Sequence, residues 1–271
     1  MVAVDQMYPS PEQPQNLTDE RPVDFRVGLY REALLRTIYK PQVTFRSGSA
    51  RPFKPIPKSQ AYPMLEWGMN WCIASYEYTR LIIHAAVLVR DGNAIIFPAD
   101  PGSGKSTLAA GLSLTGWDLY SDEMAIIDLQ TLEAQPIFRP VCLKNESIGL
   151  IQNWHPSAIM TERFVDTTKG DVAHLRSIDR KTFDSLAPAR VKAVVFPKYA
   201  ANTQLQSQRL SESDGLEKLI KNAFNYHMLG RAAFETCVAI TNSAEFHTLA
   251  YQDLEDVAKF LEAGLNVGSI A

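Results

Sequence analysis

The chain has 271 residues, 46% of them hydrophobic and 21% charged, so it can bury a sizeable core and disorder of the whole chain is excluded. Its formal net charge of −3 provides no basic field for nucleic acid, so any polyanion must be held by a local site. The cysteines Cys72, Cys142 and Cys237 form no CxxC pair, which argues against zinc or disulfides and predicts small core residues in a reduced protein. The sequence contains neither a secretion signal nor an apolar run of membrane-spanning length, so we expect a cytoplasmic protein without a membrane span.

The first 80 residues contain no motif that carries chemistry. Residues 1–22 are polar and contain four prolines, so we expect a flexible arm without a helix, or a strap on a neighbouring subunit. The elements expected after the arm are short strands at 23–30 and 41–46, a stiff connector at 51–57, and a helix at 63–78 with Pro63 in its first turn.

Two apolar runs in the centre of the chain, 81–90 and 94–99, are separated only by Asp91-Gly92-Asn93. Asp-Gly between such runs is typical of a tight β-hairpin. The strand that leads into residue 99 is therefore predicted to be antiparallel to the strand before it. In the commonest nucleotide-binding folds the preceding strand arrives through a helical crossover, so the hairpin indicates a less common architecture.

The remaining elements alternate between strands and helices. A helix is expected from 105 to Gly116, followed by a strand, two acids and a second strand within 117–129. We expect the sheet to continue through 135–143 and a buried strand at 191–199, with irregular structure at 145–190. Two helices are expected near the end: one capped by Ser211, with Leu216, Leu219, Ile220 and Ala223 on one face, and one between Asp253 and Gly264.

The stretch FPADPGSGKSTLAAGL, residues 97–112, matches the phosphate-binding pattern GxxxxGK[ST] except that Ala99 occupies the first glycine position. In this motif backbone N–H groups and a helix N-terminus surround a bound anion. Lys105 would lie along the β- and γ-phosphates, and the Ser106 hydroxyl would bind Mg²⁺. A Cβ at Ala99 could hinder the tight turn, whereas Pro101 would hold the loop rigid.

Asp122 and Glu123 follow the strand after this helix, where nucleotide-binding proteins place their magnesium-binding acid. One carboxylate could hold the metal while the other accepts a proton from an attacking hydroxyl. We assign the proton to Asp122 and the metal to Glu123, and the reverse order is the alternative. Glu146, in the charged stretch after the acids, is a further candidate for the metal shell.

Three segments, HAAVLV, FPADPGSGKST and YSDEMAII, resemble the core of the bacterial HPr kinase/phosphorylase group, and more specifically the smaller HPr-kinase-related kinases. The resemblance covers residues 81–129. It implies an α/β P-loop kinase with a mixed sheet of the HPr kinase/phosphoenolpyruvate carboxykinase type, here a single domain over 23–271 with 23–80 as an elaboration. Ala99, Pro101 and Glu123 depart from the family's glycine, serine and second aspartate.

The resemblance also implies roles for individual residues. The catalytic set is Asp122, Glu123, His84 and Lys105; without the resemblance, His84 would be read as an ordinary core histidine. The nucleotide-binding set is Asp100, Pro101, Gly102, Ser103, Gly104, Lys105, Ser106 and Thr107. The metal set is Ser106, Glu123 and Asp122, to which the charged stretch after the acids adds Glu146.

We therefore expect a kinase that uses ATP and Mg²⁺ to phosphorylate a hydroxyl of a protein, peptide or small molecule, with a serine of a protein or peptide as the favoured acceptor. The family's later glycine-rich, arginine-bearing segment has no recognised counterpart here, which argues against the reverse phosphorolysis. The parent family forms rings, so a homo-oligomer is compatible with the resemblance. Two alternatives remain: a GTP-binding switch, because residues 167–171 read TTKGD, and a nucleotide-binding module without transfer activity.

Overall fold

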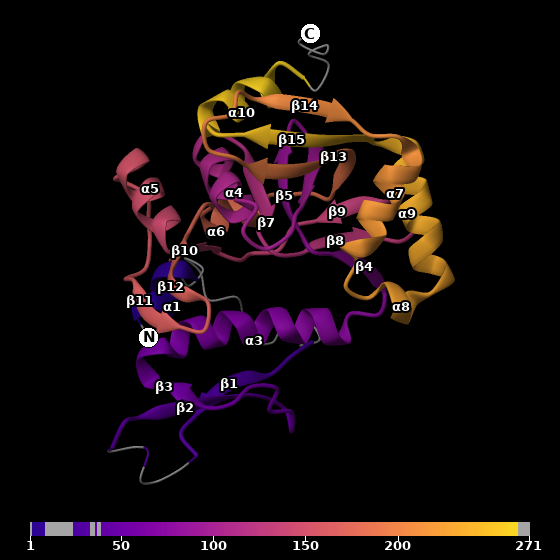
Figure 1. Cartoon of the computed structure of the whole chain (residues 1–271). Helices are drawn as coiled ribbons and strands as arrows, with labels where there is room; N and C mark the ends of the chain where they lie inside the picture. Colours follow the sequence, from indigo (N-terminus) through magenta and orange to yellow (C-terminus); the bar gives the residue numbers. More distant parts are fainter. Residues whose placement is uncertain (1, 9–23, 33–35, 37–38, 265–271) are drawn as a thin grey trace.

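The structure, a computed structural model, describes residues 2–8, 24–32, 36 and 39–264 (Figure 1). The helices are α1 (Val2–Met7), η1 (Lys58–Gln60), α3 (Ala61–Tyr76), α4 (Lys105–Leu114), α5 (Glu146–Trp154), α6 (Arg180–Asp184), α7 (Glu212–Lys221), α8 (Tyr226–Leu229), α9 (Arg231–Ser243) and α10 (Leu254–Glu262). The strands are β1 (Val27–Tyr30), β2 (Gln42–Ser47), β3 (Ile56–Pro57), β4 (Arg80–Ile83), β5 (Ala85–Arg90), β6 (Asn93–Pro98), β7 (Asp118–Ser121), β8 (Ala125–Asp128), β9 (Glu133–Gln135), β10 (Val141–Lys144), β11 (Phe164–Thr167), β12 (Gly170–Leu175), β13 (Ala189–Tyr199), β14 (Gln206–Arg209) and β15 (Glu245–Tyr251). None of the helices described is both long and apolar enough to cross a membrane.

The fold is mixed α/β, with a mixed nine-stranded sheet in the order β4-β8-β9-β13-β6-β5-β7; β15 pairs with β13, and β14 pairs with β15. The predicted hairpin is confirmed: β5 and β6 are antiparallel, Arg90 faces Asn93, and both turn residues, Asp91 and Gly92, have positive φ. On its other side β6 runs parallel to β13, which in turn runs parallel to β15. The carboxyl ends of three parallel strands therefore meet at the edge where β6 leads into the loop at 99–104.

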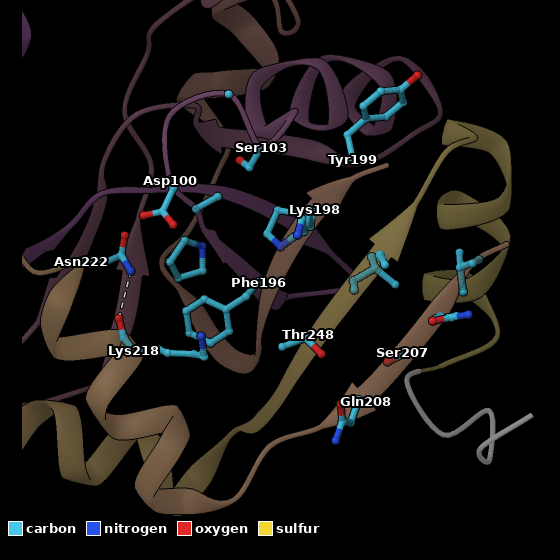
Figure 2. A pocket seen from close by; sticks show the side chains of 18 of the residues that line it. Asp100, Ser103, Phe196, Lys198, Tyr199, Ser207, Gln208, Lys218, Asn222 and Thr248 are labelled. Carbon is cyan, nitrogen blue, oxygen red and sulfur yellow. Dashed lines mark hydrogen bonds between the residues drawn. The ribbon is translucent and has the colours of Figure 1, made fainter. Parts of the chain in front are cut away.

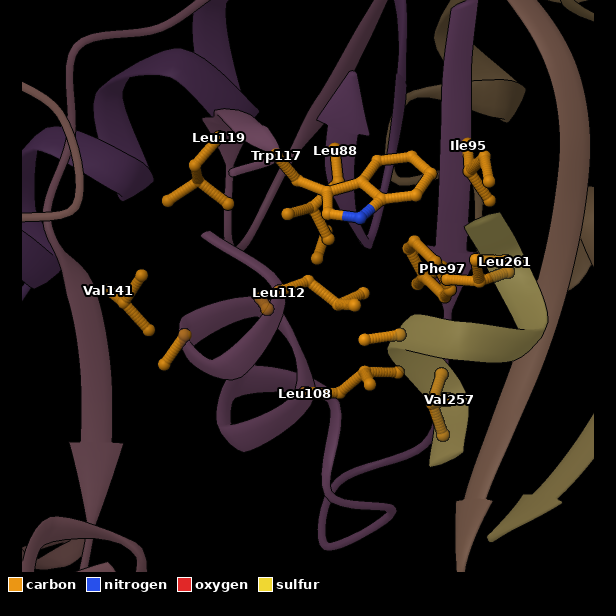
Figure 3. Packing of buried hydrophobic residues seen from close by; sticks show 14 of the residues in the cluster. Leu88, Ile95, Phe97, Leu108, Leu112, Trp117, Leu119, Val141, Val257 and Leu261 are labelled. Carbon is orange, nitrogen blue, oxygen red and sulfur yellow. The ribbon is translucent and has the colours of Figure 1, made fainter. Parts of the chain in front are cut away.

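Helices cover both faces of this sheet because its central strands are apolar on both faces. On one face, Leu108 and Leu112 of α4 pack with Val257 and Leu261 of α10 against Phe97 of the sheet (Figure 3). On the other face, α7 and α9 pack through an apolar cluster that includes Leu219, Cys237 and Ile240. The predicted cap residues are confirmed: Ser211 and Asp253 accept hydrogen bonds from helix N–H groups, and Gly116 and Gly264 have positive φ after their helices.

The elements expected between 23 and 80 are present: β1 and β2 form a small sheet with β3, and α3 lies between this sheet and the rest of the molecule in Figure 1. Gly68 allows α3 to approach β2 closely, since a Cβ there would lie 2.1 Å from the Phe45 ring. The three cysteines are buried, as predicted.

Three expectations about individual segments are wrong. Val2–Met7 is a helix, α1, because Met7 is buried in an apolar cluster; the rest of the expected arm, 9–22, lies outside the described residues. The segment 135–143 does not continue the central sheet beyond β9, because β10 pairs instead with β12 in a separate sheet, β10-β12-β11. Much of 145–190 is also regular structure: it contains α5, α6 and the β11–β12 hairpin, and the pairing of β12 with β10 is a long-range contact that local periodicity does not reveal.

Candidate active site

The loop between β6 and α4 has the backbone of a phosphate-binding loop. Gly102 and Gly104 have φ values of 86° and 88°, a region in which residues with a Cβ are strained. A Cβ at Gly104 would also lie 2.7 Å from the Tyr251 hydroxyl, which donates a 3.2 Å hydrogen bond to the Gly104 carbonyl. The Ser103 carbonyl accepts a 2.9 Å bond from the Tyr199 N–H. The ends of β13 and β15 therefore hold the loop on one side.

Ala99 fits this loop without strain. It is buried, and it is not among the described residues with positive φ. The conformational freedom of glycine is therefore not needed at this position. The replacement of the motif's first glycine by Ala99 therefore does not close the loop.

The start of α4 presents unpaired backbone donors. The first helical bond runs from the Leu108 N–H to the Gly104 carbonyl at 2.9 Å. Among the described residues, the N–H groups of Gly104, Lys105, Ser106 and Thr107 donate to no protein acceptor. Unpaired N–H groups at a helix N-terminus attract anions, so the loop can hold a phosphate group.

Lys105 and Asp122 form a buried pair below the loop. The Lys105 ammonium donates to the backbone carbonyl of Asp122 and lies 3.8 Å from its Oδ1. The Cys142 N–H donates a 3.2 Å bond to the other carboxylate oxygen, Oδ2. Burial raises the pKa of Asp122 above its ordinary value; Lys105 opposes this shift, Glu123 adds to it, and the Cys142 N–H and the nearby Ser106 hydroxyl lower it.

Glu123 lies at the more open side of this pair. Its carboxylate is 3.5 Å from His84 Nε2, and about a quarter of each side chain is exposed, against 2% for Asp122. Burial alone would raise the pKa of Glu123, but a hydrogen bond from His84 and the nearby lysine charges hold it below its usual range. The His84 ring stacks on Phe224, with ring centres 5.1 Å apart. His84 is therefore held against Glu123 rather than buried as an ordinary core histidine.

The site has features suited to magnesium. Asp122 Oδ1 is buried and has no hydrogen-bond partner, and it lies in the same small region as Lys105 and Ser106. Within the described residues no three His, Cys, Asp or Glu side chains gather to form a metal cage. Mg²⁺ usually takes one or two carboxylates and fills its remaining positions with water and phosphate oxygens. One buried carboxylate beside a hydroxyl and an anion loop fits that pattern.

Two predicted features do not line the pocket beside the loop, although Lys169 of the TTKGD segment is among the lysines whose charges lower the pKa of Glu123. Glu146 is an exposed residue in the first turn of α5, and among the described residues it belongs to no cluster of three or more His, Cys, Asp or Glu side chains. The TTKGD segment forms the turn between β11 and β12: the Thr167 hydroxyl donates to the Gly170 carbonyl, and the Asp171 carboxylate lies 3.6 Å from Arg163. None of its residues lines the pocket beside the loop.

That pocket was not predicted from the sequence. It is a groove of about 1230 Å³, here called the loop groove, at the carboxyl ends of the parallel strands (Figure 2). It is lined by most of the loop, Ala99–Ser103, by the ends of β13 and β15, by β14, and by the last turn of α7. The exposed Lys198 and Tyr199 directly after the buried part of β13 were a local signal for it.

A buried polar network behind Asp122 was also missed. Arg139 bonds Glu66 of α3 at 2.6 and 3.1 Å, and the Tyr8 hydroxyl donates to the same carboxylate at 3.1 Å. A cavity of about 20 Å³ separates Glu66 and Arg139 from Asp122 and Glu123. The second Glu66 oxygen, Oε1, is buried without a partner, as is Asp122 Oδ1. The lone arginine and glutamate, 73 positions apart, give no sequence signal.

No family model matches the chain, and no curated protein matches its sequence. Among solved structures, the chain is similar to the Hpr(Ser) kinase/phosphatase from Coxiella burnetii, with 11% identity and a TM-score of 0.29, over 68% of this chain and 93% of that chain. At this identity and TM-score the likeness carries no argument about activity. The functional inference must come from the residues of the site.

Proposed function

We propose that the protein is an ATP-dependent kinase that transfers the γ-phosphoryl group to a hydroxyl, with a serine of a protein or peptide as the favoured acceptor. The observation that carries this proposal is the position of the buried Lys105–Asp122 pair directly below a loop with unpaired N–H donors. A loop with its lysine, a hydroxyl and a nearby acid is the usual equipment for holding a nucleoside triphosphate with Mg²⁺.

The exposure of the two carboxylates favours a specific division of labour. Asp122 is 2% exposed and next to Ser106, so an acceptor hydroxyl cannot easily reach it. Glu123 is 26% exposed and is paired with His84. We therefore assign Asp122 with Ser106 to the metal and Glu123 to the proton, the reverse of the order first assigned from the sequence.

In this mechanism Mg²⁺ would supply charge neutralisation at the phosphate oxygens. The loop N–H groups and Lys105 hold the triphosphate, and Lys105 exchanges its bond to the Asp122 carbonyl for a phosphate oxygen. Glu123, which His84 orients, accepts the proton of the acceptor hydroxyl. The acceptor oxygen bonds to the γ-phosphorus while the bond from that phosphorus to the β,γ-bridging oxygen breaks, which releases the nucleoside diphosphate.

The first test is the thermal stability of the purified protein with Mg²⁺ and ATP, GTP or pyrophosphate. ATP at about a hundred times its Kd should stabilise the fold by about 2.7 kcal/mol, which is a shift of roughly 5–10 °C for a domain of this size. Lys105→Ala should abolish the shift, and Lys259→Ala, at an exposed lysine of α10, is the matched control. If no nucleotide stabilises the protein, or if Lys105→Ala responds like the wild type, the proposal fails.

The second test separates transfer from binding and uses ATP labelled in its γ-phosphate. Glu123→Gln should keep the thermal response to ATP and lose labelling of the acceptor, whereas Asp122→Asn should weaken the Mg²⁺-dependent part of binding. Stabilisation by GTP rather than ATP would favour the switch protein. Binding of ATP without transfer to any hydroxyl would favour the non-catalytic module.

A further inference from the structure

The side chains that line the loop groove have a net positive charge, whereas the chain as a whole is negative. Its charged lining residues are Lys198, Lys218 and Lys221 against one acid, Asp100, so its formal charge is +2 in a chain of net charge −3 (Figure 2). Three positive side chains on one hollow surface raise the local concentration of anionic groups. The groove therefore selects for an acidic occupant.

Two of these lysines have no carboxylate partner among the described residues. Lys221 pairs with Glu217, one turn earlier in α7. The Lys218 ammonium instead lies over the ring of Phe196, 5.6 Å from the ring centre. Lys198 takes part in no ion pair among the residues that the structure describes. Both are exposed, so their charges remain available to a ligand.

One end of the groove is connected through Asn222 to His84, the partner of the proposed proton acceptor. Asn222, at the end of α7, lines the groove, and its backbone carbonyl accepts a 2.7 Å bond from the backbone N–H of His84. His84 in turn lies 3.5 Å from Glu123. Neither His84 nor Glu123 lines the groove itself, so a chain in the groove would reach this pair by extending past Asn222.

The size and wall of the groove favour a polypeptide. Its volume exceeds the roughly 300–1,000 Å³ that is usual for small-molecule sites. One wall is β14, whose residues Gln206–Gln208 line the groove. Among the described strands β14 pairs only with β15, so its second edge can accept an extended segment.

We propose that the loop groove binds an acidic polypeptide segment that carries the acceptor hydroxyl. Lys198 and Lys218 recognise its carboxylates, and the part of the segment that extends past Asn222 places its hydroxyl beside Glu123. This inference rests on the proposed kinase function for the transfer step, but binding of the segment can be measured without nucleotide.

The probe is a short fluorescein-labelled peptide of glutamates with one central serine, and its counterpart has lysines in place of the glutamates. Fluorescence anisotropy should show that the acidic peptide binds and that added salt weakens its binding. The double variant Lys198→Glu/Lys218→Glu should weaken binding by at least about tenfold. Lys192→Glu is the matched control, since Lys192 is an exposed lysine of the same strand that does not line the groove.

The same variants are then tested for thermal stabilisation by ATP with Mg²⁺. Retained stabilisation in the double variant, together with lost peptide binding, supports a segment site separate from the nucleotide. Equal binding of the two peptides, or an effect of Lys192→Glu as large as that of the double variant, overturns the inference. Loss of ATP binding in the double variant also overturns it, because the groove would then hold the nucleotide. If wild-type protein binds the acidic peptide but no nucleotide, the proposed kinase function fails while the groove site stands.

Discussion

Arg139 and Glu66 form an ion pair that is almost fully removed from water, with side-chain exposures of 11% and 4%. Arg139 makes two bonds to Glu66 Oε2, at 2.6 and 3.1 Å, and a third to the Glu66 backbone carbonyl at 2.8 Å. Arg139→Met removes all three and leaves a buried carboxylate that, among the described residues, keeps the hydrogen bond from the Tyr8 hydroxyl. Breaking one side of a buried pair typically costs about 3–5 kcal/mol, because the remaining charge is neither solvated nor paired.

We therefore expect Arg139→Met to lower the free energy of unfolding by about 3–5 kcal/mol, or the melting temperature by roughly 10 °C. The double variant Glu66→Leu/Arg139→Met removes both charges and should regain most of this loss. Tyr8→Phe removes only one hydrogen bond and should cost about 1 kcal/mol. Urea unfolding followed by tryptophan fluorescence measures all of them, since Trp67 lies next to Glu66 in α3.

The reasoning is refuted if Arg139→Met costs less than about 1 kcal/mol, which is the level of an exposed ion pair. It is equally refuted if the double variant is as unstable as the sum of the two single variants. Additive losses would mean that the two side chains stabilise the fold independently, without the coupling that their geometry implies.

Three further predictions concern the loop and the core behind it. Ala99→Gly should leave ATP-dependent stabilisation unchanged, since Ala99 does not have positive φ; a clear gain in nucleotide affinity would contradict this. Gly104→Ala should abolish nucleotide binding, because φ at this position is 88° and the added Cβ would clash with Tyr251. Gly92→Ala, with φ of 73° and open space around it, should lower the free energy of unfolding by about 1–2 kcal/mol and keep nucleotide binding. Equal nucleotide responses of the two variants would show that the clash is unimportant. Burial lowers the pKa of His174 from 6.5 to about 4, so between these pH values the unfolded chain binds a proton that the folded protein does not. Lowering the pH through this range should therefore reduce the free energy of unfolding by up to about 1.4 kcal/mol per pH unit. His174→Phe, which keeps an aromatic ring against Tyr62, should remove that part of the pH dependence, and an unchanged stability profile over this pH range would exclude His174 as its cause.

The parts of the fold that were predicted from the sequence depend on neighbours in the chain. Asp91-Gly92 specifies its hairpin because both positions need positive φ, and Ser211 and Asp253 cap helices that begin directly after them. The loop at 99–104 is likewise a local pattern, and its glycines Gly102 and Gly104 adopt positive φ. The helix at Val2–Met7 was missed because its stability comes from burial of Met7 in a distant cluster, whereas local composition is dominated by the prolines that follow.

For the candidate site, the sequence by itself determined the anion loop, its lysine and hydroxyl, and the pair of acids after the next strand, because each is a short pattern with a backbone requirement. Only the tertiary structure decided how those groups are arranged. The pairing of β10 with β12 brings the Cys142 N–H to Asp122, and β4 places His84 against Glu123, so that one acid is buried and the other is left open. The lysines of the loop groove come from β13 and α7, which lie far from the loop in the chain. Burial and charge pairing depend on contacts between distant segments, and local sequence patterns do not encode them.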